Sequence, residues 1–359
     1  MTLTYIAFAV AFFFALNIGA SGTAAAMGPA YGSGAVKNKR IAMCIVGVGA
    51  FLGALAGGEV VRTIGSGIIP ESIVEVNLVV IILSAACLTL FIANIIGIPL
   101  STSEVVVGAI VGAGIAYNAL YLETLLVIVS FWVIIPFVAF SLSFVFGKVI
   151  QHAEKKWPQL KGKGKWGRWL AMLLIITGFL EAFAAGMNNV ANAVGPLVGA
   201  GLLDVTTAVW FGGAFVALGA LLLGGRVLET NGKRITKLSL LQGSAVSATG
   251  GTLVIFSSLF GIPVPLTQVT TSGILGIGTA DNGFKLWQKD VIKRIIKVWV
   301  VSPVFSLVVS YGLILLFLQS DFYTLIVIVS VFIATVGSIS LLSATRKEKS
   351  TIHDQGGGI

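Results

Sequence analysis

Ten stretches of this chain carry no Asp, Glu, Lys or Arg, and each is long enough, at 18 to 43 residues, to cross or half-cross a lipid bilayer. A helix needs about 20 apolar residues to span the hydrocarbon. Only 10% of the residues are charged and 57% are hydrophobic, which excludes an ordinary soluble globular protein. We therefore predict an all-α, polytopic membrane protein of about 10 to 12 transmembrane or half-spanning helices. The charge-free stretches are residues 1–36, 41–58, 76–103, 105–122, 124–147, 182–203, 205–225, 238–280, 298–320 and 322–345.

The basic residues predict how the chain is placed in the cell membrane. Although the net charge is +9, the Lys and Arg residues lie in short connections between apolar stretches, as in cytoplasmic loops, so we expect no nucleic-acid partner. Residues 147–168 hold seven Lys or Arg against one Glu. We expect 148–168 to be a basic cytoplasmic linker between residues 1–147 and 169–345, with a polar tail at 346–359. The opening stretch lacks the marks of a signal peptide, so we expect it to be retained.

An internal repeat relates the two parts of the chain on either side of this linker. A shift of 167 residues places Gly19–Gly34 on Gly186–Gly201, with seven identical Gly, Ala or Pro positions. A shift of 164 residues places "GIPLSTSEVVVGAIVGAG" at 97–114 on "GIPVPLTQVTTSGILGIG" at 261–278. The same order of matched blocks predicts that residues 1–147 and 169–345 are two repeats of one design.

The loop charges predict that the two repeats are inverted in the membrane. Three basic residues, Lys37, Lys39 and Arg40, correspond to one acidic and two neutral residues in the second repeat. By the positive-inside rule, equivalent loops then lie on opposite sides of the bilayer. Transporters built from inverted repeats bind their substrate near the midplane, where helices are broken.

The two matched Gly-rich stretches are candidates for such breaks. Irregular backbone at membrane depth is tolerated only where it is buried in protein or lines an aqueous cavity. The alternative is close helix packing through small residues, which we favour for Gly53 and Gly57 at four-residue spacing. For Gly19–Gly34 and Gly186–Gly201 we favour a broken helix at a binding site, because proline and the asparagines add nothing to packing.

Neutral polar residues gather at the matched blocks and form the candidate substrate site. No Lys or Arg lies within these motifs, so an anion would be held by hydroxyls, amides and the N–H groups at helix starts. The alternative is that each hydroxyl bonds back to a carbonyl of its own helix. The candidate substrate-binding residues are Ser21, Gly22, Thr23, Ser101, Thr102, Ser103, Asn188, Asn189, Asn192, Thr267 and Gln268.

These motifs resemble those of the inorganic phosphate transporter family. "GMNNVANAVGPL", which begins at Gly186, looks like the family signature "GANDVANA", and "GIPLSTSE" looks like its partner "G-x-P-x-S-T-T". The resemblance covers nearly the whole chain and, within the family, is greatest to the bacterial sulfate permeases of the CysP type. It implies a secondary transporter that moves a tetrahedral oxyanion with Na⁺ or H⁺ as a homodimer.

Two departures from the family pattern favour sulfate over phosphate. Where phosphate carriers of the family have Asp within the signature, this chain has Gly22 and Asn189. Phosphate keeps a proton near neutral pH and can donate it to a carboxylate, whereas sulfate has none and would meet a carboxylate lone pair to lone pair. In the second repeat Pro265 and Leu266 replace the family's Ser and Thr, which weakens the assignment of substrate contacts in that half.

Import of a dianion against a negative membrane potential requires a cation. The loss of both Asp residues removes the sodium ligands that the resemblance implies, so we expect co-transported H⁺ rather than Na⁺. Glu104 and Glu181 lie in apolar surroundings that disfavour the charged form, and they are the candidate coupling residues. The alternative for each is a carboxylate stabilised by a helix dipole.

Several other functions remain open on the sequence alone. A phosphate symporter of the same family is the nearest alternative, and a channel is another. An intramembrane enzyme is disfavoured, because no His or Cys lies near the motifs and the carboxylates are isolated. Cys44 and Cys87 are single thiols in apolar stretches, so we expect no disulfide, metal site or cofactor.

Overall fold

The computed structural model describes residues 1–96, 100–162, 164–234, 238–283, 290–324, 326–327 and 330. Every regular element within these residues is helical, which confirms the predicted all-α class. The predicted polar tail at 346–359 lies outside the described residues. The helices are α1 Thr2–Ile18, α2 Gly28–Gly32, α3 Lys39–Leu55, α4 Gly58–Arg62, α5 Val76–Ile96, α6 Thr102–Ala116, α7 Leu122–Lys156, α8 Lys165–Gly199, α9 Val205–Leu223, α10 Gly225–Arg234, α11 Leu240–Leu259, α12 Leu266–Asn282 and α13 Asp290–Ile314.

The lengths and apolar composition of these helices confirm a multi-pass integral membrane protein. Among the described residues, six helices are long and apolar enough to cross a bilayer, and α3 with the following segment Gly58–Gly67 makes a seventh if the bent pair is one span. That pair bends by 65°. The described residues also include two shorter apolar helical segments, Val76–Ile92 in α5 and Thr102–Ala116 in α6.

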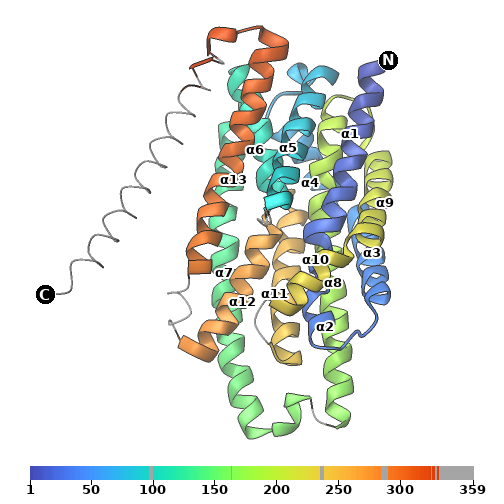
Figure 1. The fold of residues 1–359 in the computed structure, drawn as a ribbon, viewed down its shortest axis with the longest axis vertical. Coiled ribbons are helices and arrows are strands. Elements are labelled where there is room, and N and C mark those ends of the chain that lie inside the picture. Colours follow the sequence, from blue (N-terminus) through green and yellow to red (C-terminus); the bar gives the residue numbers. More distant parts are fainter. Residues whose placement is uncertain are drawn as a thin grey trace, which may run out of the picture.

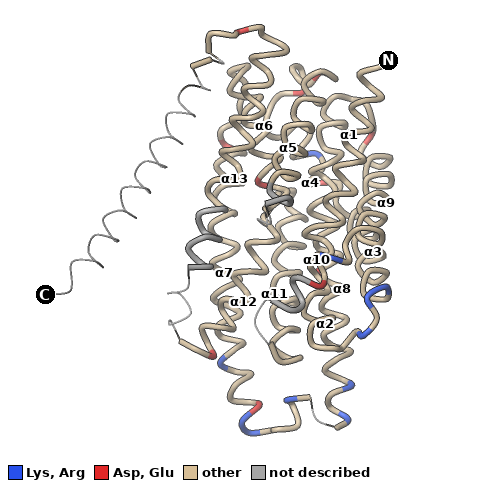
Figure 2. The backbone as a smooth tube through the Cα atoms, viewed as in Figure 1, with Lys and Arg blue, Asp and Glu red and all other residues tan. Residues whose placement is uncertain are grey.

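Two helical hairpins enter the bundle from opposite ends (Figure 1). The hairpin of α5 and α6 comes from the end where the N-terminus lies, and that of α11 and α12 comes from the end where α7 turns into α8. Helix α1 runs toward the α7–α8 turn, whereas α8 runs away from it. Lys and Arg residues gather at the end that holds this turn (Figure 2). The start of α6 and the start of α12 meet in the middle of the bundle.

Side-chain caps fix where several helices begin. The Asn38 side chain accepts a hydrogen bond from the backbone N–H of Arg40 at the start of α3. Asp204 caps α9 by accepting from the Thr207 N–H at 3.0 Å. Hydrogen bonds from the Thr207 hydroxyl and from the Thr207 backbone N–H hold the pKa of the Asp204 carboxyl below its usual range. Ser239 and Gln242 form a reciprocal capping box at the start of α11. These caps lie at helix starts, where backbone N–H groups lack helical partners.

The first Gly-rich stretch is broken, as predicted. Helix α1 ends at Ile18, a π-helical turn covers Gly19–Thr23, and α2 begins only at Gly28. Pro29 lies in the first turn of α2, where its missing N–H would have no helical acceptor in any case.

The prediction of a second broken helix, at Gly186–Gly201, was wrong, because residues 186–199 form the last part of the continuous helix α8. Their glycines instead allow close backbone packing. A Cβ atom on Gly186 would lie 1.9 Å from the Ala50 carbonyl oxygen of α3, and one on Gly199 would lie 2.1 Å from the Gly65 carbonyl oxygen. Packing through small residues, the alternative weighed for this stretch, therefore applies here.

Gly53 and Gly57 pack closely, as predicted. A Cβ on Gly53 would lie 1.9 Å from the Phe183 carbonyl oxygen, and one on Gly57 would lie 2.4 Å from that of Met187. Helix α3 therefore lies directly against the backbone of α8.

Candidate functional site

The start of α6 carries three consecutive hydroxyl residues into the middle of the bundle. Ser101 is the N-cap residue, and Thr102 and Ser103 occupy the first turn. All three are buried, with exposures of 1 to 6%. A helix start presents unpaired N–H groups and the positive end of the helix dipole, so it favours an anion.

The asparagines of α8 face this helix start and form a network with it. Asn188 Nδ2 donates to Ser103 Oγ at 3.1 Å, and Asn192 Nδ2 donates to Thr102 Oγ1 and Ser103 Oγ, both at 3.2 Å. Thr102 Oγ1 donates in turn to Asn189 Oδ1 at 3.3 Å. The hydroxyls therefore bond across to another helix, and the alternative of bonding back to their own helix does not hold for Thr102 and Ser103.

Asn188 also fixes the segment that leads into α12. Its Nδ2 donates to the Val264 carbonyl oxygen at 2.9 Å, and its Oδ1 accepts from the Val264 N–H at 3.0 Å. This paired contact holds an extended residue whose backbone groups have no helical partners. Asn188 is thus occupied by structural contacts, whereas Asn189 Nδ2 makes no hydrogen bond within the described part of the chain.

Glu104 and Gln268 come together where the start of α6 meets the start of α12. Gln268 Nε2 donates to Glu104 Oε1, and Ser302 Oγ of α13 donates to Glu104 Oε2 at 2.9 Å. The sequence shift of 164 residues makes Glu104 and Gln268 equivalent positions of the two repeats. Direct contact between equivalent positions is expected if a two-fold axis relates the two predicted repeats and passes between these helix starts.

Glu181 forms a second buried carboxylate site, on α8. Its Oε1 accepts from Thr270 Oγ1 of α12 at 2.7 Å, whereas its Oε2 has no hydrogen-bond partner among the described residues. Glu181 and Asn188 are seven residues apart, which places them about two turns apart on one face of the helix. Helix α12 joins this site to the first, because Gln268 and Thr270 both lie near its start.

The broken segment after α1 reaches the same region. A Cβ on Gly22 would lie 3.8 Å from Thr267 Oγ1, with no closer neighbour, so this glycine borders open space rather than a packed backbone. Thr23 is fully buried and its hydroxyl has no hydrogen-bond partner among the described residues. Ser21 Oγ donates to the Ile18 carbonyl oxygen at 3.2 Å, so this hydroxyl bonds back to its own helical segment, which was the alternative to substrate binding.

The site is therefore neutral except for two separate carboxylates. No group of three or more His, Cys, Asp or Glu side chains able to hold a metal occurs among the described residues. Cys44 and Cys87 are free thiols. Hydroxyls, amides and helix-start N–H groups remain, and these can bind an oxyanion by hydrogen bonds alone.

Ser302 is a residue of this site that we did not predict. A signal for it exists in the apolar stretch 298–320, where Ser302, Ser306 and Ser310 recur at every fourth position. All three are buried, with exposures of 0 to 3%. Polar residues at helical spacing in an apolar stretch mark a face turned toward the protein rather than toward lipid.

Comparisons with known proteins were made at the levels of family, sequence and structure. A family described as "Phosphate transporter family" matches residues 18–310. The sulfate permease CysP of Bacillus subtilis is 55% identical over 360 residues, covering 100% of both chains. A putative phosphate permease of Pyrococcus furiosus is 28% identical over 374 residues, covering 81% of this chain and 90% of its own. A solved structure titled "The sodium-dependent phosphate transporter" is similar with a TM-score of 0.76 and 26% identity, over 87% of this chain and 98% of that chain.

Proposed function

Because this chain belongs to the phosphate transporter family, and is therefore an inorganic anion transporter rather than an enzyme, we propose that it imports sulfate. The proposed mechanism is secondary active transport with a co-transported cation, H⁺ in preference to Na⁺, by alternating access. The observation that carries the choice of sulfate is Asn189, whose amide nitrogen has no partner in the described network. The 55% identity to a sulfate permease supports the same choice.

The chemistry of the site matches a fully deprotonated tetrahedral anion. Among the described residues, Asn189 Nδ2 and the Thr23 hydroxyl make no hydrogen bond, so both can donate to an anion, and the start of α6 adds backbone N–H groups. Sulfate accepts hydrogen bonds at every oxygen and donates none. A site that presented a carboxylate instead would leave two acceptors facing each other, which costs about 1 to 3 kcal/mol per mismatched group.

We assign the coupling proton to Glu104, with Glu181 as a second candidate. Burial disfavours the charged form of a carboxylic acid, so each can hold a proton during transport. Ser302 suits this role at Glu104, because a serine hydroxyl donates to the carboxylate and can rotate to accept from the protonated acid. The Gln268 NH₂ group can only donate, so it cannot accept a hydrogen bond from the protonated form of Glu104.

The two-repeat architecture supports alternating access. A Cβ on Gly219 of α9 would lie 2.0 Å from the Leu16 carbonyl oxygen of α1. A Cβ on Gly53 of α3 would lie 1.9 Å from the Phe183 carbonyl oxygen of α8. Phe183 is the equivalent of Leu16 under the shift of 167 residues, so each repeat packs its second long helix on the first helix of the other. We propose that residues 1–147 and 169–345 are inverted repeats about the site, with 148–168 as their cytoplasmic linker, and that two chains form a homodimer.

Phosphate is the second candidate substrate. Several relatives are described as putative phosphate permeases, and the similar solved structure is a sodium-dependent phosphate transporter. Among the described residues, the buried Asn192 Oδ1 atom has no hydrogen-bond partner and could accept a hydrogen bond from a protonated phosphate.

A transport assay in proteoliposomes separates these possibilities. Labelled sulfate and labelled phosphate are supplied to the same vesicles under an inward H⁺ gradient, an inward Na⁺ gradient, or neither. The proposal expects sulfate to accumulate above its external concentration only with the H⁺ gradient, and a protonophore to abolish this accumulation. Preferential phosphate uptake, or accumulation driven by Na⁺ alone, would overturn it, and equilibration without accumulation under every gradient would indicate a channel.

A further inference from the structure

A cavity of about 680 Å³ lies at the basic end of the bundle, away from the candidate substrate site. It is formed where α3 begins, α9 ends and α10 begins. Three basic side chains line it on one part, and four apolar side chains line it on the other. The lining residues are Lys39, Arg40, Met43, Leu221, Leu222, Leu223, Gly225 and Arg226.

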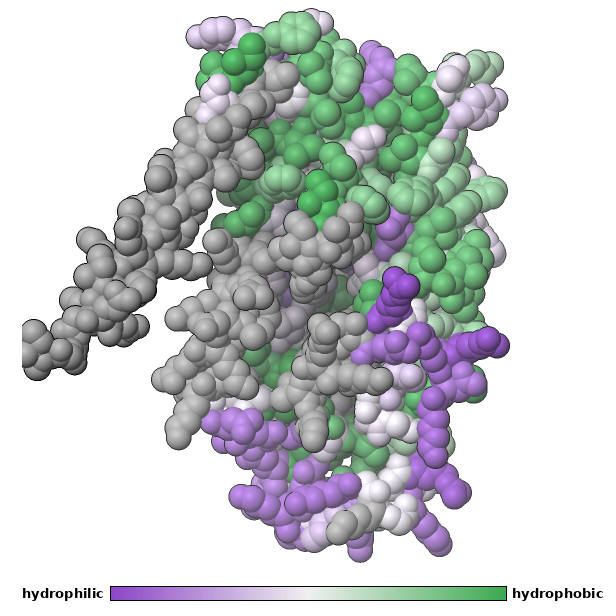
Figure 3. Space-filling view, viewed as in Figure 1, coloured by the Kyte–Doolittle hydropathy of each residue, from purple (hydrophilic) through white to green (hydrophobic). Residues whose placement is uncertain are grey.

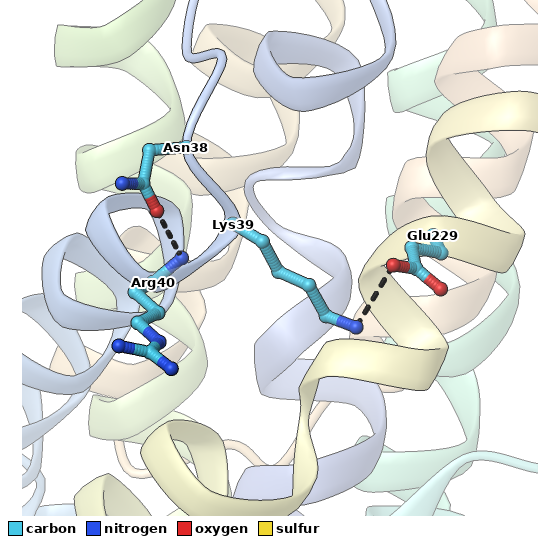
Figure 4. A network of polar contacts seen from close by, with 4 residues as sticks. All are labelled: Asn38, Lys39, Arg40 and Glu229. Atoms are coloured by element: carbon cyan, nitrogen blue, oxygen red, sulfur yellow. Dashed lines mark hydrogen bonds and ion pairs between the residues drawn. The ribbon is translucent and has the colours of Figure 1, made fainter.

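The charges at this cavity are not balanced. Lys39 Nζ pairs with Glu229 Oε1 of α10 at 2.8 Å, and this is the one ion pair at the cavity among the described residues. Figure 4 shows the Lys39 side chain reaching across to Glu229, while the Arg40 guanidinium points away from it. Arg40 and Arg226 are exposed and are not part of that pair. Among the described side chains at the cavity, three cations and one carboxylate give a net charge of +2.

The apolar side of the cavity faces outward. Leu221, Leu222 and Leu223 form the last turn of α9 and are 42%, 73% and 57% exposed. Since α9 is one of the membrane-crossing helices, its last turn lies where hydrocarbon gives way to headgroups. In Figure 3 a cluster of hydrophilic side chains lies directly beside the apolar surface at this level.

We infer that this cavity binds an anionic phospholipid, with the headgroup phosphate on the basic residues and an acyl chain along the exposed leucines. A phosphate diester carries one negative charge, which the net charge of the cavity complements. A free oxyanion would contact the basic side chains but not the leucines. A neutral lipid would contact the leucines but would have no charge to pair with the basic side chains. Basic pockets between helices on the cytoplasmic side suit such headgroups.

Lys39 has a positioning role in this site. Its side chain lies over Gly225, where a Cβ would fall 2.3 Å from Lys39 Cε. Because the Lys39–Glu229 pair ties the start of α3 to α10, the cavity walls are held together before a lipid enters. Arg40 and Arg226 lie outside this pair, so their positive charges are available to the headgroup phosphate.

The test is lipid retention by the purified protein, measured by native mass spectrometry with added dioleoylphosphatidylglycerol or dioleoylphosphatidylcholine. The wild type is expected to retain the phosphatidylglycerol preferentially. The double variant Arg40→Gln/Arg226→Gln should bind it roughly 10- to 30-fold more weakly, since each basic residue near a surface contributes about fivefold. The control Lys155→Gln/Lys161→Gln removes two exposed cations from the linker region and should change nothing.

Two further measurements distinguish a lipid from a free oxyanion. Leu222→Gln should weaken phosphatidylglycerol retention while leaving the thermal unfolding temperature unchanged. Inorganic phosphate or sulfate at millimolar concentration should not displace the lipid. Equal retention of both lipids by the wild type, equal loss in the linker control, or displacement by an inorganic oxyanion would overturn the inference.

Discussion

The proposed choice of sulfate over phosphate depends on Asn189. It lies on α8 beside the start of α6, accepts from Thr102 at its oxygen and leaves its nitrogen without a partner in the described network. An aspartate of the same shape would present two acceptor oxygens and a negative charge at this point. The difference between an amide and a carboxylate is therefore a difference in which anions can be bound.

We predict that Asn189→Asp lowers sulfate transport by at least about tenfold, because one hydrogen bond is lost and charge repulsion is added in a desolvated site. Phosphate transport should fall less than sulfate transport, or should rise, since the phosphate hydroxyl can donate to the new carboxylate. The measurement is the ratio of sulfate to phosphate uptake at one pH, with expression matched. A ratio that stays the same or rises would show that Asn189 does not distinguish the two anions.

The second prediction at this scale concerns Glu104. A glutamine there keeps the shape and can still contact Ser302 and Gln268, but it cannot gain or lose a proton. We expect Glu104→Gln to abolish accumulation driven by the H⁺ gradient while exchange of internal for external sulfate continues. Glu59→Gln is the matched control, because Glu59 pairs with Arg62 at an exposed position.

Accumulation that persists in Glu104→Gln would remove Glu104 from the coupling step. The same assay on Glu181→Gln then decides whether the second buried carboxylate carries the proton. Loss of both accumulation and exchange in Glu104→Gln, with an unfolding temperature like that of the wild type, would instead place Glu104 in substrate binding.

At the scale of elements, glycine positions determine how closely the long helices approach. Gly186 lies in the interior of α8, and a Cβ there would overlap the Ala50 carbonyl oxygen of α3. Gly250 lies in the interior of α11, and a Cβ there would have ordinary contacts at 3.7 Å or more. The two glycines have the same local conformation but different surroundings.

We predict opposite effects for alanine at these two glycines. In a helix interior alanine is favoured over glycine by about 1 kcal/mol, so Gly250→Ala should leave the unfolding temperature unchanged or raise it. Gly186→Ala should lower it by several degrees, because α3 and α8 must separate to admit the methyl group. Thermal unfolding followed by size-exclusion chromatography measures both, and equal shifts would refute the packing role of Gly186.

The whole molecule has a basic end and an end that holds the N-terminus (Figures 1 and 2). From the positive-inside rule we predict that the basic end lies in the cytoplasm and the N-terminus outside. The exposed residues Thr2 and Lys161 mark the two ends.

Cysteine labelling in intact cells tests this orientation. In a background with Cys44 and Cys87 replaced by Ala, Thr2→Cys should react with an impermeant maleimide. Lys161→Cys should react only after the membrane is permeabilised. The reverse labelling pattern would show the opposite orientation in the membrane, with the phospholipid cavity in the outer leaflet.

Much of this organisation could be predicted from the sequence. Charge-free stretches indicate membrane helices because hydrocarbon excludes charge, and the matched blocks locate the residues that gather at the centre. The triplet at Ser101–Ser103 and the asparagines of α8 were identified in this way, as was the broken segment after Ile18.

Only the tertiary structure decided which residue of a motif serves which purpose. Glycine gives the same signal in a sequence whether it breaks a helix or admits a neighbouring backbone, so the continuity of α8 through Gly195 was not predictable. A single hydroxyl is likewise ambiguous: Ser21 bonds within its own segment, whereas Ser302 reaches Glu104 from a distant helix. These outcomes depend on which helices lie side by side, and long-range contacts of that kind are set by the packing of the entire bundle rather than by local sequence.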